Sequence, residues 1–306
     1  KKKIVVASIL AALAMQTASV IDVAAAVGDQ PSAAIANGSV TSGKTNGLAI
    51  GNFASSGSNQ SIAIGYYSVA TATEADPALP ATAVGAGANA TGQSTVALGL
   101  LAQATSGSTT ALGAKSVASE DAAVAVGYGT KATGNYASAL GADATASNND
   151  ATAFGHGTVA SGGSSTALGS RAKAGGTAGV GIGMLANATN QYGVAIGGES
   201  SSSADNSIAI GRKSSVTGES GIAIGAFTTS KGANGVAVGT NGTKSDLGGV
   251  AVGQAAQSIA FNSVATGMNV TAKGANSVAL GASATANDDG TIAIGSYGST
   301  PTKATG

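Results

Sequence analysis

The chain has 306 residues, of which 48 are glycine and only 9% are charged. Its fourteen basic and fourteen acidic side chains give zero formal net charge, so no long-range field attracts nucleic acid or an anionic membrane. Cysteine is absent, which excludes disulfide bonds and thiolate metal sites, and we expect no cofactor.

The first residues have the pattern of a secretory signal peptide. Lys1, Lys2 and Lys3 precede an apolar run from Ile4 to Met15, and small residues follow as far as Ala26. The run is too short to span a membrane comfortably. We predict that residues 1–26 direct secretion across the inner membrane and that residues 27–44 form a lead-in segment. A buried N-terminal helix that trimerises the chain is the alternative.

From Gly51 onward the sequence is a repeat array, predicted to occupy residues 45–306. A period of fourteen residues is too short for helical repeats, whose units run to about 33 to 47 residues, and it suits one coil of a β-solenoid. A corner between strands often needs positive φ or close approach of the next coil, which explains the glycine. The glycines keep this interval except for one twenty-residue step after Gly65, and they are Gly51, Gly65, Gly85, Gly99, Gly113, Gly127, Gly141, Gly155, Gly169, Gly183, Gly197, Gly211, Gly225, Gly239, Gly253, Gly267, Gly281 and Gly295.

Counted from each glycine as position zero, positions eleven and thirteen carry large apolar residues, with a small residue between them. Position thirteen is polar only at Thr266, and position eleven is Val, Ile or Leu in most coils. Such alternation predicts a strand with one buried face. We expect this apolar ladder to fill the interior and the alternate, alanine-rich face to support lateral association into a closed oligomer. Small residues at positions three and five predict a second short strand.

The twenty-residue step contains an insertion at residues 73–80. It carries two of the chain's four prolines and two acids. Insertions in solenoids loop out on one face, often the binding face, although a tolerated bulge without function is equally compatible. The candidate binding residues of this loop are Glu74, Asp76 and Leu79.

Bulky and basic residues gather one or two places after the glycines. Equivalent positions superpose in stacked coils, so these residues should form a longitudinal stripe, which we call the turn stripe. Packing across a trimer seam is the preferred interpretation, and a ligand-facing strip is the other, because binding surfaces are enriched in aromatic residues and arginine. The candidates are Tyr66, Tyr67, Tyr128, Phe227, Arg171 and Arg212.

Catalytic and metal-binding patterns are weak. His156, the only histidine, follows Gly155 in a turn, and a catalytic base would need an oriented partner. The glycine-rich nonapeptide of calcium-binding β-helices is missing. Glycines at 179, 181 and 183 follow the solenoid spacing, and no helical pattern comes after them. We therefore expect no enzyme activity and no metal.

Repeated phrases give the chain a family resemblance. Asn206-Ser-Ile-Ala-Ile-Gly211, Asn276-Ser-Val-Ala-Leu-Gly281 and Ala132-Thr-Gly134 resemble the head repeats of YadA-like trimeric autotransporter adhesins of Gram-negative bacteria, over about residues 45 to 300. The resemblance implies an all-β, left-handed parallel β-roll, a homotrimer and display at the cell surface. It also implies extracellular matrix proteins such as collagen, host cells or sibling adhesins as partners. A heptad stalk, a neck and an outer-membrane anchor do not follow the last coil, so we expect the head portion of a longer protein or another kind of fibre.

The sequence as a whole predicts a non-enzymatic adhesin head that attaches to host matrix or cells. Many weak contacts along the repeats and across three chains would give firm attachment through multivalency. The alternative is a structural trimeric fibre of a virion or surface filament that has no ligand of its own.

Overall fold

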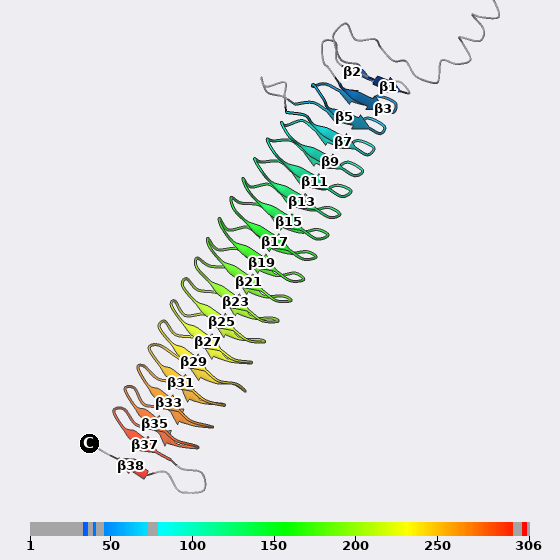
Figure 1. Ribbon diagram of the computed structural model, residues 1–306. Coiled ribbons are helices and arrows are strands. Elements are labelled where there is room, and N and C mark those ends of the chain that lie inside the picture. Colours follow the sequence, from blue (N-terminus) through cyan, green and yellow to red (C-terminus); the bar gives the residue numbers. More distant parts are fainter. Residues whose placement is uncertain (1–32, 36–38, 41–45, 73–78, 296–301, 305–306) are drawn as a thin grey trace, which may run out of the picture. The chain divides into compact units, whose positions relative to one another are not determined.

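The computed structural model describes residues 33–35, 39–40, 46–72, 79–295 and 302–304, which form strands and turns and contain no helix. The chain forms two compact units, Lys1–Asp143 and Ala144–Gly306. Within each unit a coil contributes one three-residue strand and one two-residue strand, joined by two turns (Figure 1). We call the sheet of three-residue strands sheet A and the sheet of two-residue strands sheet B. The predicted parallel β-solenoid is confirmed.

The described residues of the first unit form fifteen strands. Sheet A of this unit consists of β1 (Ala33–Ile35), β3 (Leu48–Ile50), β5 (Ile62–Ile64), β7 (Thr82–Val84), β9 (Val96–Leu98), β11 (Thr110–Leu112), β13 (Val124–Val126) and β15 (Ser138–Leu140). Sheet B consists of β2 (Ser39–Val40), β4 (Ser55–Ser56), β6 (Val69–Ala70), β8 (Asn89–Ala90), β10 (Gln103–Ala104), β12 (Val117–Ala118) and β14 (Lys131–Ala132).

The second unit repeats this arrangement. Its sheet A consists of β17 (Thr152–Phe154), β19 (Thr166–Leu168), β21 (Val180–Ile182), β23 (Val194–Ile196), β25 (Ile208–Ile210), β27 (Ile222–Ile224), β29 (Val236–Val238), β31 (Val250–Val252), β33 (Val264–Thr266), β35 (Val278–Leu280), β37 (Ile292–Ile294) and β38 (Thr302–Ala304). Its sheet B consists of β16 (Thr145–Ala146), β18 (Val159–Ala160), β20 (Lys173–Ala174), β22 (Asn187–Ala188), β24 (Ser201–Ser202), β26 (Ser215–Val216), β28 (Thr229–Ser230), β30 (Lys244–Ser245), β32 (Gln257–Ser258), β34 (Thr271–Ala272) and β36 (Thr285–Ala286).

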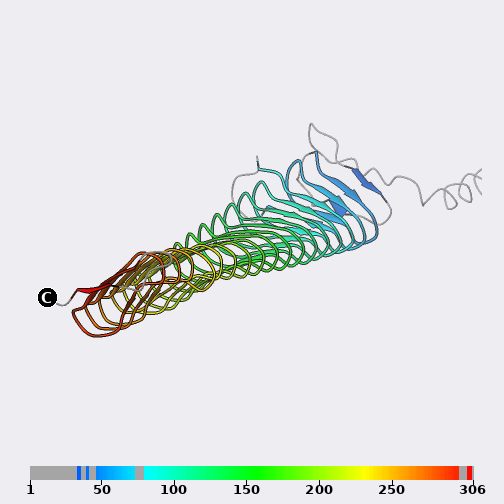
Figure 2. The same cartoon turned by 90° about the horizontal axis from the view of Figure 1, so that it is seen from below.

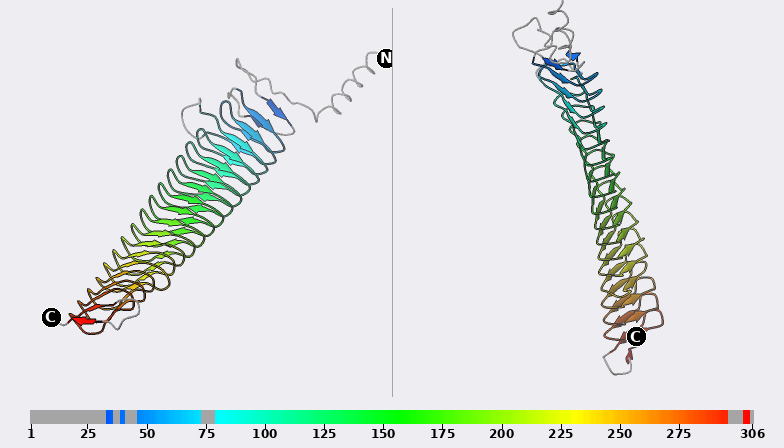
Figure 3. Two further views of the ribbon diagram at one scale, coloured as in Figure 1. Left: turned by 60° about the horizontal axis from the view of Figure 1, so that its bottom comes forward. Right: turned by 90° about the vertical axis from the view of Figure 1, so that its right-hand side faces the viewer.

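Neighbouring coils pair in parallel and in register, so equivalent positions lie on top of one another. Ile208 pairs with Ile222 and Ala209 with Ala223, for example. Figure 3 shows the arrows of sheet A stacked in one direction within each unit. Only β38 pairs antiparallel with its neighbour, β37, among the described strands. The fourteen-residue period of the sequence therefore becomes a set of longitudinal rows.

The corner glycines combine positive φ with close approach of the next coil, the two reasons for glycine that the sequence analysis gave. Gly183 has φ +126°, and a Cβ added there would lie 2.7 Å from the carbonyl oxygen of Gly197 in the next coil. A side chain at this corner would thus be strained by the backbone and would also collide with the neighbouring main chain. Glycine at position zero is a requirement of the stacking distance between coils.

The interior of each coil is lined by positions three, five, ten and twelve, which hold Ala, Ser, Thr and Gly in nearly every coil. Ala111, Ala125, Ala209 and Ala223 at position twelve are all fully buried. At Gly181, which takes the place of alanine in β21, even a Cβ would overlap the carbonyl oxygen of Lys173 in sheet B. Figure 2 shows the coils of the second unit as successive loops of the ribbon, one behind another. In most coils the two sheets are too close for larger side chains, and the largest that are fully buried among the described residues are Val216 and Val270.

The expected direction of the apolar ladder is therefore wrong. The large residues at positions eleven and thirteen point out of the coil, and Leu98 and Ile224 are 42% and 38% exposed. The alanine-rich face, expected to support lateral association, is the interior. Alternation indicated correctly that one strand face is buried, but the narrow coil accepts the methyl group of alanine and rejects branched side chains.

Buried hydroxyl groups hold the turns. Thr130 Oγ1 at position three donates to the carbonyl oxygen of Gly127 at 2.7 Å, and Thr95 Oγ1 at position ten donates to Gly92 O at 2.8 Å. Ser258 Oγ at position five donates across the interior to Ser263 O at 2.8 Å. A buried hydroxyl without a partner would cost free energy, and these bonds remove that cost.

The coil between Gly239 and Gly253 departs from the others but keeps the period. Four residues separate Gly239 from β30 where other coils have three, and four residues, not five, separate β30 from β31. Lys244 still pairs with Thr229 and Gln257, so the sheet continues. The shift leaves the buried hydroxyl of Ser245 without a hydrogen-bond partner among the described residues.

One coil shows how the interior accepts a larger residue. Val216 at position five is fully buried, and the facing position ten is Gly221, where a Cβ would lie 2.8 Å from Val216 Cγ1. The missing methyl group of the glycine makes room for the valine. The side chains at positions five and ten therefore fill the same interior space, so a larger residue at one position requires a smaller one at the other.

This complementarity predicts a non-additive pair in the first unit. Ala118→Val at position five should destabilise the chain by about 1–3 kcal/mol, because the facing Ala123 leaves no room. Adding Ala123→Gly should recover part of the loss by recreating the arrangement of Val216 and Gly221. Thermal unfolding of the three variants measures the coupling. Val117→Ile, which points outward, is the control and should be nearly neutral.

Candidate functional site

The outer face of sheet A is an exposed apolar surface in both units. It is made by the apolar ladder, whose exposed members include Val96, Leu98, Leu112, Val124 and Leu140 in the first unit and Phe154, Leu168, Ile224, Val252, Leu280, Ile292 and Ile294 in the second. In-register pairing stacks these residues in two rows. Contiguous exposed apolar surface of this kind marks an interaction site in a water-soluble protein.

The outer face of sheet B has the opposite character. Its outward residues are mostly Ser, Thr, Asn, Gln and Lys, and Lys131, Lys173 and Lys244 are exposed there. Each coil therefore carries one apolar outer face and one polar outer face. This asymmetry indicates that the sheet B face meets water while the sheet A face meets another surface.

The turn stripe begins in the first unit with three contacting rings. Phe53 and Tyr67 stack with centroids 4.6 Å apart, and Tyr66 meets both rings edge-on at 6.1 and 4.5 Å. Phe53 and Tyr67 occupy the left-handed backbone region that the second residue of this turn adopts in coil after coil. All three rings are more than half exposed. The structure thus places Tyr66 and Tyr67, together with Phe53, in a cluster of exposed rings, which we call the aromatic platform.

Further along the first unit, the stripe carries a basic and aromatic pair. Lys115 Nζ lies 5.7 Å from the centroid of the Tyr128 ring and donates to its hydroxyl at 3.5 Å. Tyr128 is 54% exposed. Tyr128 therefore contacts a neighbouring lysine, and it is separated from the aromatic platform by intervening coils.

In the second unit, Arg212 lies over the ring of Phe227, with Cζ 4.5 Å from the ring centroid. Lys213 forms an ion pair with Glu199 at 3.5 Å. Arg171 is exposed in another coil and occupies the left-handed position of its turn. Arg212 and Phe227 therefore make a cation–π pair, while Arg171 stands apart from them. Charged residues interrupt the stripe along this unit.

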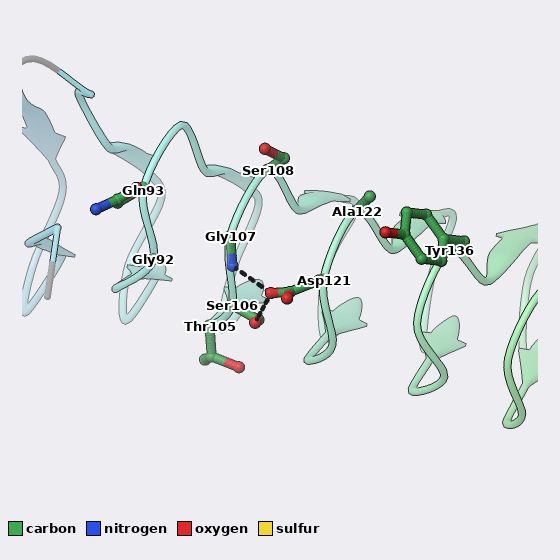
Figure 4. A pocket seen from close by; sticks show the side chains of 9 residues that line it. All are labelled: Gly92, Gln93, Thr105, Ser106, Gly107, Ser108, Asp121, Ala122 and Tyr136. Carbon is green, nitrogen blue, oxygen red and sulfur yellow. Dashed lines mark hydrogen bonds between the residues drawn. The ribbon is translucent and has the colours of Figure 1, made fainter. Parts of the chain in front are cut away.

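A groove that the sequence analysis missed runs along the opposite turn of the first unit (Figure 4). This second turn comprises positions six to nine. The groove has a volume of about 670 Å³ and is lined by Gly92, Gln93, Thr105, Ser106, Gly107, Ser108, Asp121, Ala122 and Tyr136. It exists because residues 107, 108 and 122 are small, whereas the flanking coils carry the larger Gln93 at position eight and Tyr136 at position nine. Comparing position eight and nine residues coil by coil could have revealed it.

The remaining candidates do not form a site. Of the insertion, residues 73–78 lie outside the described residues, so Glu74 and Asp76 stay predictions, while Leu79 is 36% exposed. The proposed signal peptide also lies outside the described residues. No group of three or more metal-ligating side chains occurs in the described part of the chain. In that same part, no helix has the length and apolar character needed to cross a membrane.

Comparison with known proteins gives one family and a similar solved structure. The model of the YadA head domain repeat matches residues 42–73, 80–102, 104–130, 132–158, 160–185, 188–214, 217–241 and 272–297. The collagen-binding domain of the Yersinia adhesin YadA is 30% identical, with a match that covers 56% of this chain and 78% of that chain at a TM-score of 0.32. No curated protein matches the chain. Between the first and the last match, the longest stretch without a family match is 242–271, which contains the shifted strand β30.

The aromatic platform makes a titration testable. Desolvation raises the pKa of Tyr66 above its ordinary value of 10.0, and the neighbouring Tyr67 raises it further by charge and hydrogen bonding. Since the folded chain favours the neutral phenol, this contribution to stability is present below pH 10 and is lost as the pH rises through the pKa of Tyr66. The difference in tyrosinate absorbance between wild type and Tyr66→Phe should have its midpoint above pH 10. A midpoint below pH 10 would contradict the upward shift of the Tyr66 pKa.

Proposed function

The chain belongs to the YadA head domain repeat family and is an adhesin head, and we propose that it works as a homotrimer that attaches to matrix proteins at many points. Members of this family are displayed on the bacterial surface, which supports the same location here. We propose secretion through residues 1–26 and anchoring by a part of the protein other than this head. The alternative of a fibre without a ligand is not favoured by the family assignment.

The apolar ladder is the surface that we assign to the trimer seam. Its rows of Val, Ile and Leu are half-exposed in the single chain, whereas the turn stripe is interrupted by Lys213, Glu199 and Arg171. A closed ring of three copies would bury the ladder of every chain on one axis, with the sheet B faces in water. This assignment replaces the earlier preference for the turn stripe as the seam.

With the seam on sheet A, the turn stripe is available for ligands. The exposed rings of Phe53, Tyr66 and Tyr67 form a platform of the type on which proline-rich, extended chains dock. Collagen consists of such chains, and the similar Yersinia domain is described as collagen-binding. We propose that this chain also contacts collagen or a related matrix protein, with weak sites multiplied along the coils and across three copies.

Catalysis has no place in this proposal. His156 is the only histidine of the chain, and its backbone oxygen accepts from Arg171 N, a bond that belongs to the stacking of turns. We propose a binding role without cofactor or metal.

The seam can be tested by charge. Ile224→Asp, on the outer face of β27, should abolish the trimer because three carboxylates, one from each chain, would be buried together on its axis. The monomeric chain should keep its fold, since this side chain points away from the interior of the coil. Sedimentation velocity reports the assembly and circular dichroism the strand content. Thr229→Asp, on the outer face of the following strand, is the matched control and should remain trimeric.

A trimer that persists in Ile224→Asp would place the seam elsewhere, and loss of strand content in that variant alone would mean that Ile224 supports the coil itself.

The ligand surface can be tested with a double substitution. Tyr66→Ala with Tyr67→Ala should weaken binding of the trimer to immobilised collagen by at least tenfold, because the platform loses two of its three rings. Surface plasmon resonance measures this. Tyr192→Ala removes an equally exposed tyrosine from the other turn and serves as control. Equal binding by all three proteins would remove the platform from the proposal and leave the trimer untouched.

A further inference from the structure

The groove on the second turn has the features of a separate ligand site. Its residues come from four successive coils of the first unit, and Figure 4 shows Gln93 and Tyr136 at its two ends with Asp121 between them. The volume of about 670 Å³ lies within the range of roughly 300–1,000 Å³ that small-molecule sites occupy. The first and second turns are at opposite edges of the sheets, so this groove is distinct from the turn stripe.

Hydrogen bonds fix the central carboxylate and leave part of it available. Asp121 Oδ1 accepts from Gly107 N at 3.1 Å and from the hydroxyl of Ser106. Both bonds are from the preceding coil and both go to Oδ1, so that among the described residues Oδ2 has no protein donor. The carboxylate is therefore oriented before any ligand arrives, which lowers the cost of binding.

Four other polar side chains of the groove are available to hydrogen-bond a ligand. Within the described part of the chain, the side chains of Gln93, Thr105, Ser108 and Tyr136 make no hydrogen bond to another residue. An amide and hydroxyls both donate and accept hydrogen bonds. Tyr136, 66% exposed, adds an aromatic wall. Tyrosine, serine and glycine are also the residues that adaptable recognition surfaces favour.

These groups determine the chemical class of the ligand. A ligand for them must present many hydroxyl groups and also an apolar face that can lie on a tyrosine ring, and a sugar ring has both. The lining contains one carboxylate and no basic residue, so it repels sulfated or carboxylated ligands. We propose that this groove binds a neutral oligosaccharide, independently of the matrix-protein surface on the turn stripe.

The first experiment identifies the ligand. The intact trimer is applied to an array of immobilised mammalian oligosaccharides that includes N-acetyllactosamine and high-mannose chains, together with their sulfated and sialylated counterparts. We expect binding to neutral members and weaker binding to the matched anionic ones. Binding to no neutral oligosaccharide, or to the sulfated members alone, would overturn the proposal.

The second experiment assigns the neutral ligand to this groove. Tyr136→Ala should weaken the affinity at least tenfold, and Asp121→Asn several-fold, in titrations with the soluble oligosaccharide. Tyr192→Ala is the matched control, since Tyr192 is an exposed tyrosine in the same left-handed position of another coil. Unchanged affinity in both groove variants would overturn the assignment.

Two further readouts separate the groove from other roles. Collagen binding should be unchanged in Tyr136→Ala, so failure of the oligosaccharide site and failure of the matrix surface are distinguishable. Sedimentation should also be unchanged. A loss of the trimer in Tyr136→Ala would mean that the groove receives a second copy of the chain, and this would overturn the proposal as well.

Discussion

The narrow space between the two sheets is the constraint on which the rest of this structure depends. Corner glycines let successive coils approach until main chain meets main chain, as Gly183 and Gly197 do. Positions three, five, ten and twelve then have room for little more than a methyl or hydroxyl group. Val216 fits because the facing residue, Gly221, has no side chain. A coil of this kind has a regular interior but buries little apolar area for each residue.

That constraint places the large apolar residues on the outside. A thin coil cannot hide Val, Ile and Leu within itself, yet two rows of them run along each unit. Their burial requires another surface, so the interior that a globular protein builds within one chain is, in the proposed trimer, built between chains. Folding and assembly are then linked, because removing the ladder from water contributes about 25 cal/mol per Å² only when partners meet.

The periodicity of the sequence was sufficient to predict the coiled architecture, but it was not sufficient to predict which face of each strand points into the coil. The glycine interval predicted the coil, the corner positions and both strands, because stacking forces equivalent residues into equivalent environments. Alternation in Ile208-Ala209-Ile210 showed two faces but could not tell which one is inside, since both residue types are apolar. Hydrophobicity alone favoured isoleucine as the buried residue, whereas of these two residues the small volume inside the coil accepts only alanine there. The small residues at positions three, five and ten already matched alanine at twelve, and considering all four positions together would have given the correct direction.

The candidate sites were harder to predict because they lie in the turns, where the repeat places the fewest constraints on residue identity. A turn position must adopt left-handed backbone but tolerates Tyr67, Arg171 or Glu199 alike, so the period carries no information about which residue serves a ligand. The groove depends on differences between neighbouring coils: Gly107 and Ala122 are small where Gln93 and Tyr136 are large. The coil after Gly239 goes further and moves a residue from one turn to the other, and Leu247, Ile259 and Phe261 are exposed in it and the next coil. Glycine corners and small interiors must therefore be kept from coil to coil, while the turns are free to diverge and to acquire separate binding functions on one scaffold.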